Sequence, residues 1–90
     1  MILLEQHIEL KIFHGNELRK YDVVELLRDD EGMSFNIFYK ERFLFSLIPT
    51  LRKFLSFELS GVNKGMSMDW KLHYKIEASL FSIFLKAPLS

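Results

Sequence analysis

Residues 33–48, MSFNIFYKERFLFSLI, place the strongest constraint on the fold of this chain. Apolar side chains alternate along both halves of the stretch, on either side of Lys40-Glu41-Arg42. Because successive strand residues point to opposite faces, each half predicts a strand with one apolar face. The two halves predict an antiparallel hairpin with strands over residues 33–39 and 43–48. We expect Pro49 to end the second strand, since proline cannot donate to a central ladder.

The length of the loop determines which side chains share a face. A three-residue loop, Lys40-Glu41-Arg42, pairs Tyr39 with Phe43 and gathers the alternating apolar residues on one face: Met33, Phe35, Ile37, Tyr39, Phe43, Phe45 and Leu47. A two-residue loop pairs Tyr39 with Arg42 and divides the aromatic side chains between the faces. We predict the three-residue loop because burial of one face selects the register. It places Arg42 where such loops prefer glycine.

In that register the opposite face of the hairpin is half apolar. It carries three polar and three apolar side chains: Ser34, Asn36, Ser46, Phe38, Leu44 and Ile48. One helix can cover only one face of a sheet, and contiguous exposed apolar residues often mark an interface. Phe38, Leu44 and Ile48 are therefore the candidate partner interface. The alternative is that residues 1–4, or a helix over residues 17–28, cover this face internally.

The segments before the hairpin predict two further strands. Residues 7–13, HIELKIF, alternate as a half-buried strand, which residues 1–4 can extend. Residues 17–28 fit two structures, because their apolar residues recur at helical spacing behind Asn16 but include the strand formers Tyr21, Val23 and Val24. We predict a strand over residues 21–28, with a helix over residues 17–28 as the alternative. We expect Gly32 to adopt a positive φ in the following turn.

The segments after the hairpin predict a last strand and a helix. Residues 53–60 alternate, whereas residues 68–86 carry a helical apolar stripe. The second segment is too long for a strand and holds no Gly or Pro, Ser67 or Asp69 can cap its start, and Pro88 stops it. The predicted fold is α+β: a single domain over residues 1–90 with an antiparallel β-meander of about five strands and a long C-terminal helix packed on one face.

Composition excludes several classes of protein. The chain has 90 residues, 49% of them hydrophobic, 12 basic and 12 acidic residues, and no cysteine. Disulfides and thiolate metal sites are therefore excluded, and a net charge of zero counts against binding polyanions through overall charge. The first ten residues, MILLEQHIEL, lack the basic region of a signal peptide. No run of uncharged apolar residues is long enough to span a membrane. We expect a cytoplasmic protein without a transmembrane segment.

Candidate catalytic residues do not form a known motif. His7, His14 and His73 lack the spacing of metal ligands, and the Asp29-Asp30-Glu31 cluster lacks that of an EF-hand. The sequence has no Gly-rich phosphate loop, nucleophile elbow or paired-carboxylate motif. We therefore predict a protein that is not an enzyme, with no catalytic, cofactor-binding or metal-binding residue and no cofactor.

Two functions are consistent with these patterns. The half-apolar second face predicts a small non-enzymatic domain that mediates protein–protein interaction, as a homodimer, other homo-oligomer or with a protein partner. The alternative is weak single-stranded nucleic-acid binding, since basic and aromatic residues of the predicted sheet interleave at Lys11-Phe13-His14, residues 38–43 and Arg52-Lys53-Phe54. The apolar stripe of the C-terminal segment is explained by packing on the sheet more simply than by a membrane surface.

Overall fold

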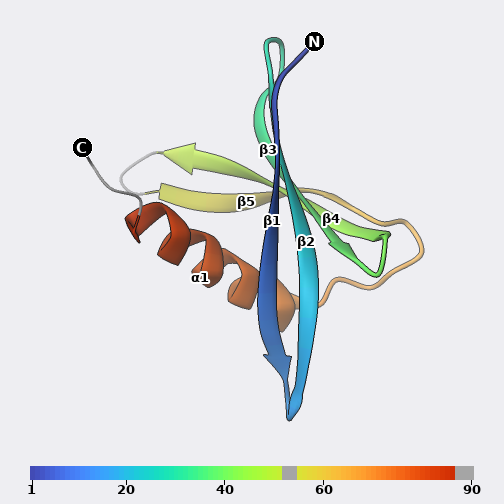
Figure 1. Ribbon diagram of the computed structural model, residues 1–90. Helices are drawn as coiled ribbons and strands as arrows, with labels where there is room; N and C mark the ends of the chain where they lie inside the picture. The colour runs from blue at the N-terminus through green and yellow to red at the C-terminus, as the bar shows by residue number, and fades with distance from the viewer. Residues whose placement is uncertain (52–54, 87–90) are drawn as a thin grey trace.

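The computed structural model describes residues 1–51 and 55–86, with side chains as far as residue 83. One antiparallel sheet contains the strands in chain order, and one helix follows it (Figure 1). The elements are β1 (Ile2–His14), β2 (Glu17–Arg28), β3 (Gly32–Tyr39), β4 (Arg42–Leu51), β5 (Leu55–Val62) and α1 (Trp70–Lys86). The sheet order β1-β2-β3-β4-β5 confirms the predicted α+β class and the five-stranded antiparallel meander. The helix has 17 residues.

The strand prediction for the second segment is confirmed, and the helix alternative is wrong. β2 begins at Glu17 and pairs with both β1 and β3. A helix there would forgo both ladders and would not line up Tyr21 and Val23, which are buried on the same face of the sheet. Gly32 has a φ of 77°, as predicted, and Gly15 has a φ of 61° in the turn between β1 and β2.

The turn of the central hairpin differs from the prediction. Tyr39 pairs with Arg42, so the loop consists of Lys40 and Glu41 alone, with φ values of 50° and 66°. Farther along, Ile37 pairs with Phe45, as the three-residue loop would have required. A β-bulge reconciles the two observations, because it inserts one extra residue into one strand of an antiparallel pair. The predicted loop is wrong, and the predicted pairing of the core residues is right.

Leu44 is the extra residue of this bulge, and it lies in the core rather than on the second face. Phe43 takes the opposite orientation from the predicted one. It pairs with Phe38, and the two ring centroids lie 5.7 Å apart. The bulge therefore exchanges the faces that the sequence predicted for these two neighbours.

Pro49 does not end β4, which continues to Leu51. The pairing of β4 with β3 stops at Leu47, whereas Pro49 pairs with Phe57 of β5. At Pro49 the strand therefore has a neighbour on one side only, and a missing N–H is tolerated on an open side. β5 begins at Leu55; the predicted start, residue 53, lies outside the described residues.

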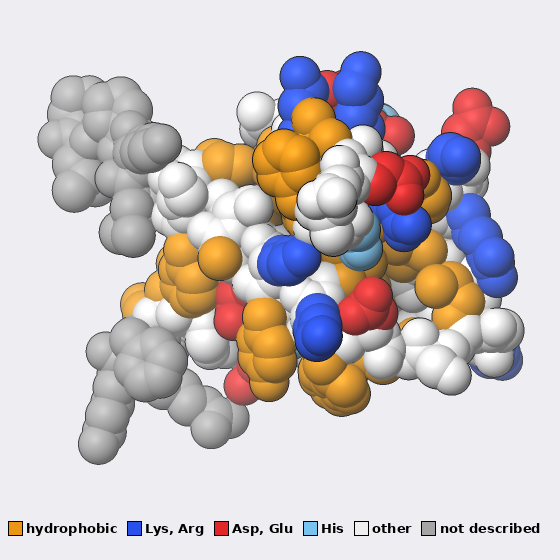
Figure 2. All heavy atoms as spheres, turned by 90° about the horizontal axis from the view of Figure 1, so that it is seen from below, with side chains coloured by type: hydrophobic (Ala, Val, Ile, Leu, Met, Phe, Trp, Pro, Cys, Tyr) orange, Lys and Arg blue, Asp and Glu red, His pale blue; other side chains and the backbone are white. Residues whose placement is uncertain are grey.

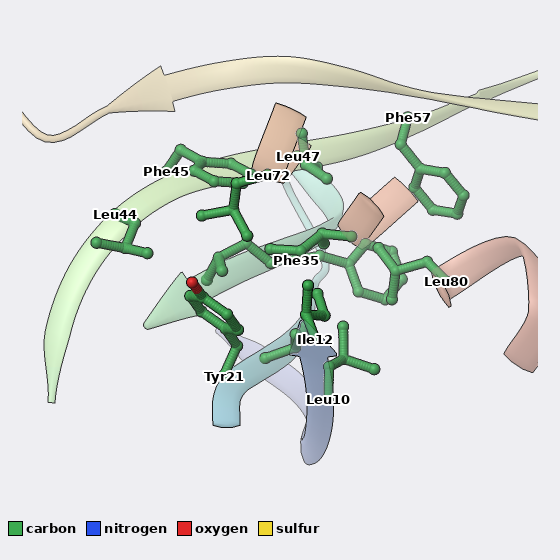
Figure 3. Close-up of a cluster of buried hydrophobic side chains, with 13 residues drawn as sticks. Leu10, Ile12, Tyr21, Phe35, Leu44, Phe45, Leu47, Phe57, Leu72 and Leu80 are labelled. Carbon is green, nitrogen blue, oxygen red and sulfur yellow. The ribbon is translucent and has the colours of Figure 1, made fainter. Parts of the chain in front are cut away.

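The core lies between one face of the sheet and α1 (Figure 3). Every strand contributes buried side chains, and the helix contributes Leu72, Ile76 and Leu80, which are spaced four residues apart on one side of α1. Asp69 caps the helix as predicted, because its Oδ1 atom accepts a hydrogen bond of 3.1 Å from the Leu72 N–H.

The helix is attached to both outer strands of the sheet. The Nζ atom of Lys75 donates a hydrogen bond of 2.7 Å to the carbonyl oxygen of Phe13 in β1. Two residues later, Oε2 of Glu77 accepts one of 3.2 Å from the Phe57 N–H in β5. α1 therefore joins the two edges of the curved sheet besides covering its apolar face.

Candidate interaction surface

The structure separates the three residues of the predicted interface. Phe38 and Ile48 are half-buried on the second face, which α1 does not cover. Leu44 is 6% exposed and packs within the core beside Phe45 (Figure 3). Its predicted position on the second face is wrong, because that prediction assumed an uninterrupted alternation, which the bulge breaks. A surface made of all three residues does not exist in this fold.

The second face is divided by a polar group at its centre. Asn36 and Ser46 pair across β3 and β4, and the Ser46 hydroxyl donates to Oδ1 of Asn36 over 2.6 Å. They border a hollow of about 330 Å³ that Ser34, Ser60 and Ile48 also line. Along β3 and β4 this polar pair lies between Phe38 and Ile48, which follows the last residue of β4 that pairs with β3. The polar pair therefore interrupts the apolar side chains of β3 and β4 on this face.

Among the described residues, the start of the outer strand β1 has the longest run of consecutive exposed apolar residues. Ile2, Leu3 and Leu4 are 47%, 57% and 43% exposed. Ile2–Leu4 extend β1, as the sequence predicted, and do not form a separate cover for the second face. Their position at the edge of the sheet was not predicted, because strand order cannot be read from the alternation within one strand. The apolar start of the chain was the available signal.

The direction of the backbone groups along β1 follows from the adjacent turn. His14 and Glu17 flank a two-residue loop and form a hydrogen-bonded pair, so their backbone N–H and C=O groups point toward each other. The next carbonyl, that of Phe13, points away from β2 and accepts the bond from Lys75. Since this direction alternates along a strand, the outward N–H and C=O groups belong to every second residue before Phe13: Glu5, His7, Glu9 and Lys11.

Side chains of like charge face one another between β1 and β2. Glu9 pairs with Asp22, and Lys11 pairs with Lys20. Like charges directly opposite are destabilising. In the described part of the chain, the ion pairs are Met1 ammonium–Asp29, His7–Glu5 and Arg19–Glu17. Glu9 and Lys11 belong to none of these described pairs. The outer strand therefore carries charges without an opposite partner directly across the ladder.

The three histidines lie in different environments. His7 is exposed beside Glu5, at 3.4 Å, and His73 is buried among the rings of Phe45, Trp70 and Tyr74. Over residues 1–51 and 55–86, no group of three His, Asp or Glu side chains is arranged to hold a metal ion. The histidines are therefore not brought together as a set of ligands.

His14 forms a short hydrogen bond with Tyr21. Its Nε2 atom lies 2.6 Å from the phenolic oxygen. Burial raises the pKa of Tyr21 above the ordinary value for a phenol. The phenol therefore stays protonated at neutral pH, and the pair links β1 to β2 near the end of their hairpin.

The basic and aromatic residues do not form one continuous surface. Lys11 and Phe13 point to the second face near the tip of the β1–β2 hairpin, whereas Tyr39 belongs to the core face, with Lys40 Nζ 5.4 Å from its ring centroid. The predicted third group, Arg52-Lys53-Phe54, lies outside the described residues. Basic and acidic side chains are intermixed over the side of the molecule seen in Figure 2. This distribution gives no extended positive field on that side.

No helix in residues 1–51 and 55–86 combines the length and apolarity needed to cross a bilayer. Comparison with protein-family models, with curated proteins and with solved structures found no match to this chain.

Proposed function

We propose that this chain is a non-enzymatic protein-interaction module that associates with itself as a homodimer. The observation that carries the proposal is the run of exposed apolar residues at the start of β1, an outer strand. An outer strand presents N–H and C=O groups that can pair with another chain, and exposed apolar residues beside them favour association. Edge and side chains together supply both the direction and the free energy of binding.

The edge of β1 supports the proposal better than the second face does. Phe38 and Ile48 are half-buried within their own sheet, and the polar pair Asn36–Ser46 lies between them. Leu3 is 57% exposed and lies in the outer strand. Burial in an interface removes more apolar surface from water at Leu3 than at residues already half-covered.

Solution mass tests the proposal. The chain has a mass of 10.7 kDa, so we expect light scattering to give twice this value over most of a hundredfold dilution series. A monomer at every concentration would contradict self-association. An oligonucleotide titration with the Lys40→Glu/Arg42→Glu variant as control would then test the alternative, weak single-stranded nucleic-acid binding.

Two matched leucine variants locate the surface. Leu3→Asp places a charge in the exposed apolar run and is expected to raise the dimer Kd at least about tenfold, which corresponds to about 1.4 kcal/mol. Leu51→Asp is the control, because Leu51 is 78% exposed on β4, away from β1. If Phe38→Asp abolishes the dimer and Leu3→Asp leaves it unchanged, the dimer forms through the second face instead.

A further inference from the structure

We infer that two copies of the chain pair through β1, antiparallel and in one register, with the two-fold axis at Ile8. The inference rests on the proposed homodimer and specifies how the two chains meet. Strand order places β1 at one edge, so this pairing joins two five-stranded sheets into one continuous sheet. The register follows from the two limits of the open edge and from the order of the charges along it.

The open part of the β1 edge has a limit on each side. Near the N-terminus, the pairing with β2 shifts between Ile2 and Leu4, which marks a bulge. At the other end, Lys75 occupies the outward carbonyl of Phe13. The outward backbone groups between these limits belong to Glu5, His7, Glu9 and Lys11, which are arranged symmetrically about Ile8. An isologous antiparallel pairing uses all of them only when its axis passes through Ile8.

The charges along this edge match the same register. With the axis at Ile8, Glu5 lies opposite the partner's Lys11, and His7 lies opposite the partner's Glu9. Each contact occurs twice by symmetry. Lys11 faces Lys20 on β2 within its own sheet, so the partner's Glu5 supplies the opposite charge that this ladder lacks.

The apolar side chains of β1 match as well. Ile8 lies opposite the partner's Ile8, and Leu4 lies opposite the partner's Ile12. Leu4 is 43% exposed and Ile8 is half-buried in the single chain. Their side chains point to the face on which Leu10 and Ile12 are buried. Pairing therefore extends the core face across the two-fold axis.

Other registers are less favourable. An axis at His7 places Glu5 opposite the partner's Glu9, and an axis at Glu9 places two Glu9 side chains together, so both bring like charges into contact. An axis at Leu10 joins Glu9 to the partner's Lys11 but leaves Glu5 beyond the paired segment. The register with its axis at Leu10 is therefore the main competitor, and Glu5 distinguishes it from the proposed one.

Charge reversal with rescue tests the register. Glu5→Lys and Lys11→Glu should each raise the dimer Kd at least about tenfold, because each creates two like-charge contacts. The double variant Glu5→Lys/Lys11→Glu exchanges the two charges, so we expect its Kd to return to within about threefold of the natural value. Both side chains are exposed, and circular dichroism checks that each variant is folded. Glu58→Lys on β5 is the control and should leave the Kd unchanged.

The outcomes separate this inference from the proposed function. A dimer that resists both single reversals would overturn pairing through β1 and leave the homodimer standing. A dimer that resists Glu5→Lys but is weakened by Lys11→Glu and by the double variant would replace the axis at Ile8 by one at Leu10. A natural chain that is monomeric throughout would remove both the homodimer and its register.

Amide hydrogen exchange gives a readout that does not depend on substitution. In the proposed dimer the outward N–H groups of Glu5, His7, Glu9 and Lys11 are hydrogen-bonded across the interface, so their exchange should slow as the concentration rises. The N–H groups of Gln6 and Ile8 point to β2 and should be protected at every concentration. Fast exchange of the outward set in a confirmed dimer would contradict the inference.

Discussion

The two outer strands of the sheet are protected to different extents. β5 has 8 residues, and Glu77 of α1 accepts a hydrogen bond from Phe57, the third residue of the strand. β1 has 13 residues, and Lys75 of the same helix reaches only its last part, at Phe13. The N-terminal part of β1 extends beyond the helix (Figure 1). A helix protects an edge only along the length that it follows, so the longer strand keeps an open segment.

This difference favours β1 over β5 as the edge for the proposed pairing. Proteins block edge strands by keeping them short, by covering them or by placing charges on them. β5 is short and contacted by a carboxylate from α1. The open segment of β1 carries charges of both signs, Glu5, Glu9 and Lys11, which do not repel every approaching strand. In the proposed dimer, an edge with this pattern would pair with a strand that carries the complementary order of charges.

The largest expected effect comes from removing the anchor of α1. Ile76→Ala should lower the free energy of unfolding by about 2–5 kcal/mol, because Ile76 is fully buried and its loss leaves a cavity between helix and sheet. Urea denaturation measures the change, and Ile76→Val, with an expected loss of about 0.5–1.5 kcal/mol, is the matched control. A loss below about 1 kcal/mol for the alanine variant would mean that the helix contributes little to covering either edge.

An intermediate effect is expected at the protected edge. Glu77→Ala removes the charged acceptor of the Phe57 N–H and should cost about 1–3 kcal/mol. Glu77→Gln keeps an acceptor oxygen and should cost less. Faster amide exchange at Phe57 in the alanine variant, with slower exchange in the glutamine variant, would support the carboxylate as the protecting group. Equal exchange rates in all three proteins would contradict that role.

The smallest effect is expected where α1 reaches β1. Lys75→Ala removes an exposed hydrogen bond to the Phe13 carbonyl and should cost less than about 1 kcal/mol. Lys71→Ala is the matched control, since Lys71 is exposed on the same helix. Comparison of their unfolding free energies measures the bond. A loss as large as that of Glu77→Ala would show that the two edges are protected equally and would remove the contrast between them.

The secondary structure was largely predictable from local patterns. Alternating apolar residues indicated the strands, and the length of the last segment together with Asp69 indicated the helix. These signals are local, because the direction of a side chain repeats with the period of its own strand or helix. Residues 17–28 fitted both a strand and a helix, and their β-branched and aromatic residues correctly indicated the strand.

The turn of the central hairpin was not predictable at the same level. Lys40 and Glu41 both adopt positive φ values, which residues other than glycine rarely do. Burial of Phe45 and Leu47 required one register, whereas the tight loop required another, and the bulge at Leu44 accommodated both. A conflict between loop and core is resolved by packing over the whole sheet, so it leaves no local signature. The candidate interface failed at Leu44 for this reason.

The amino-acid pattern was sufficient to establish an antiparallel sheet with one apolar face and a helix that covers it. Sheet order, and with it the edge position of β1, depended on contacts between segments distant in the chain. The same is true of the hydrogen bonds of Lys75 and Glu77, which join residues 62 and 20 positions apart. Periodicity describes each segment alone, whereas an edge exists only after the other strands have paired. The candidate interaction surface therefore became visible in the folded chain, although its residues stand at the very start of the sequence.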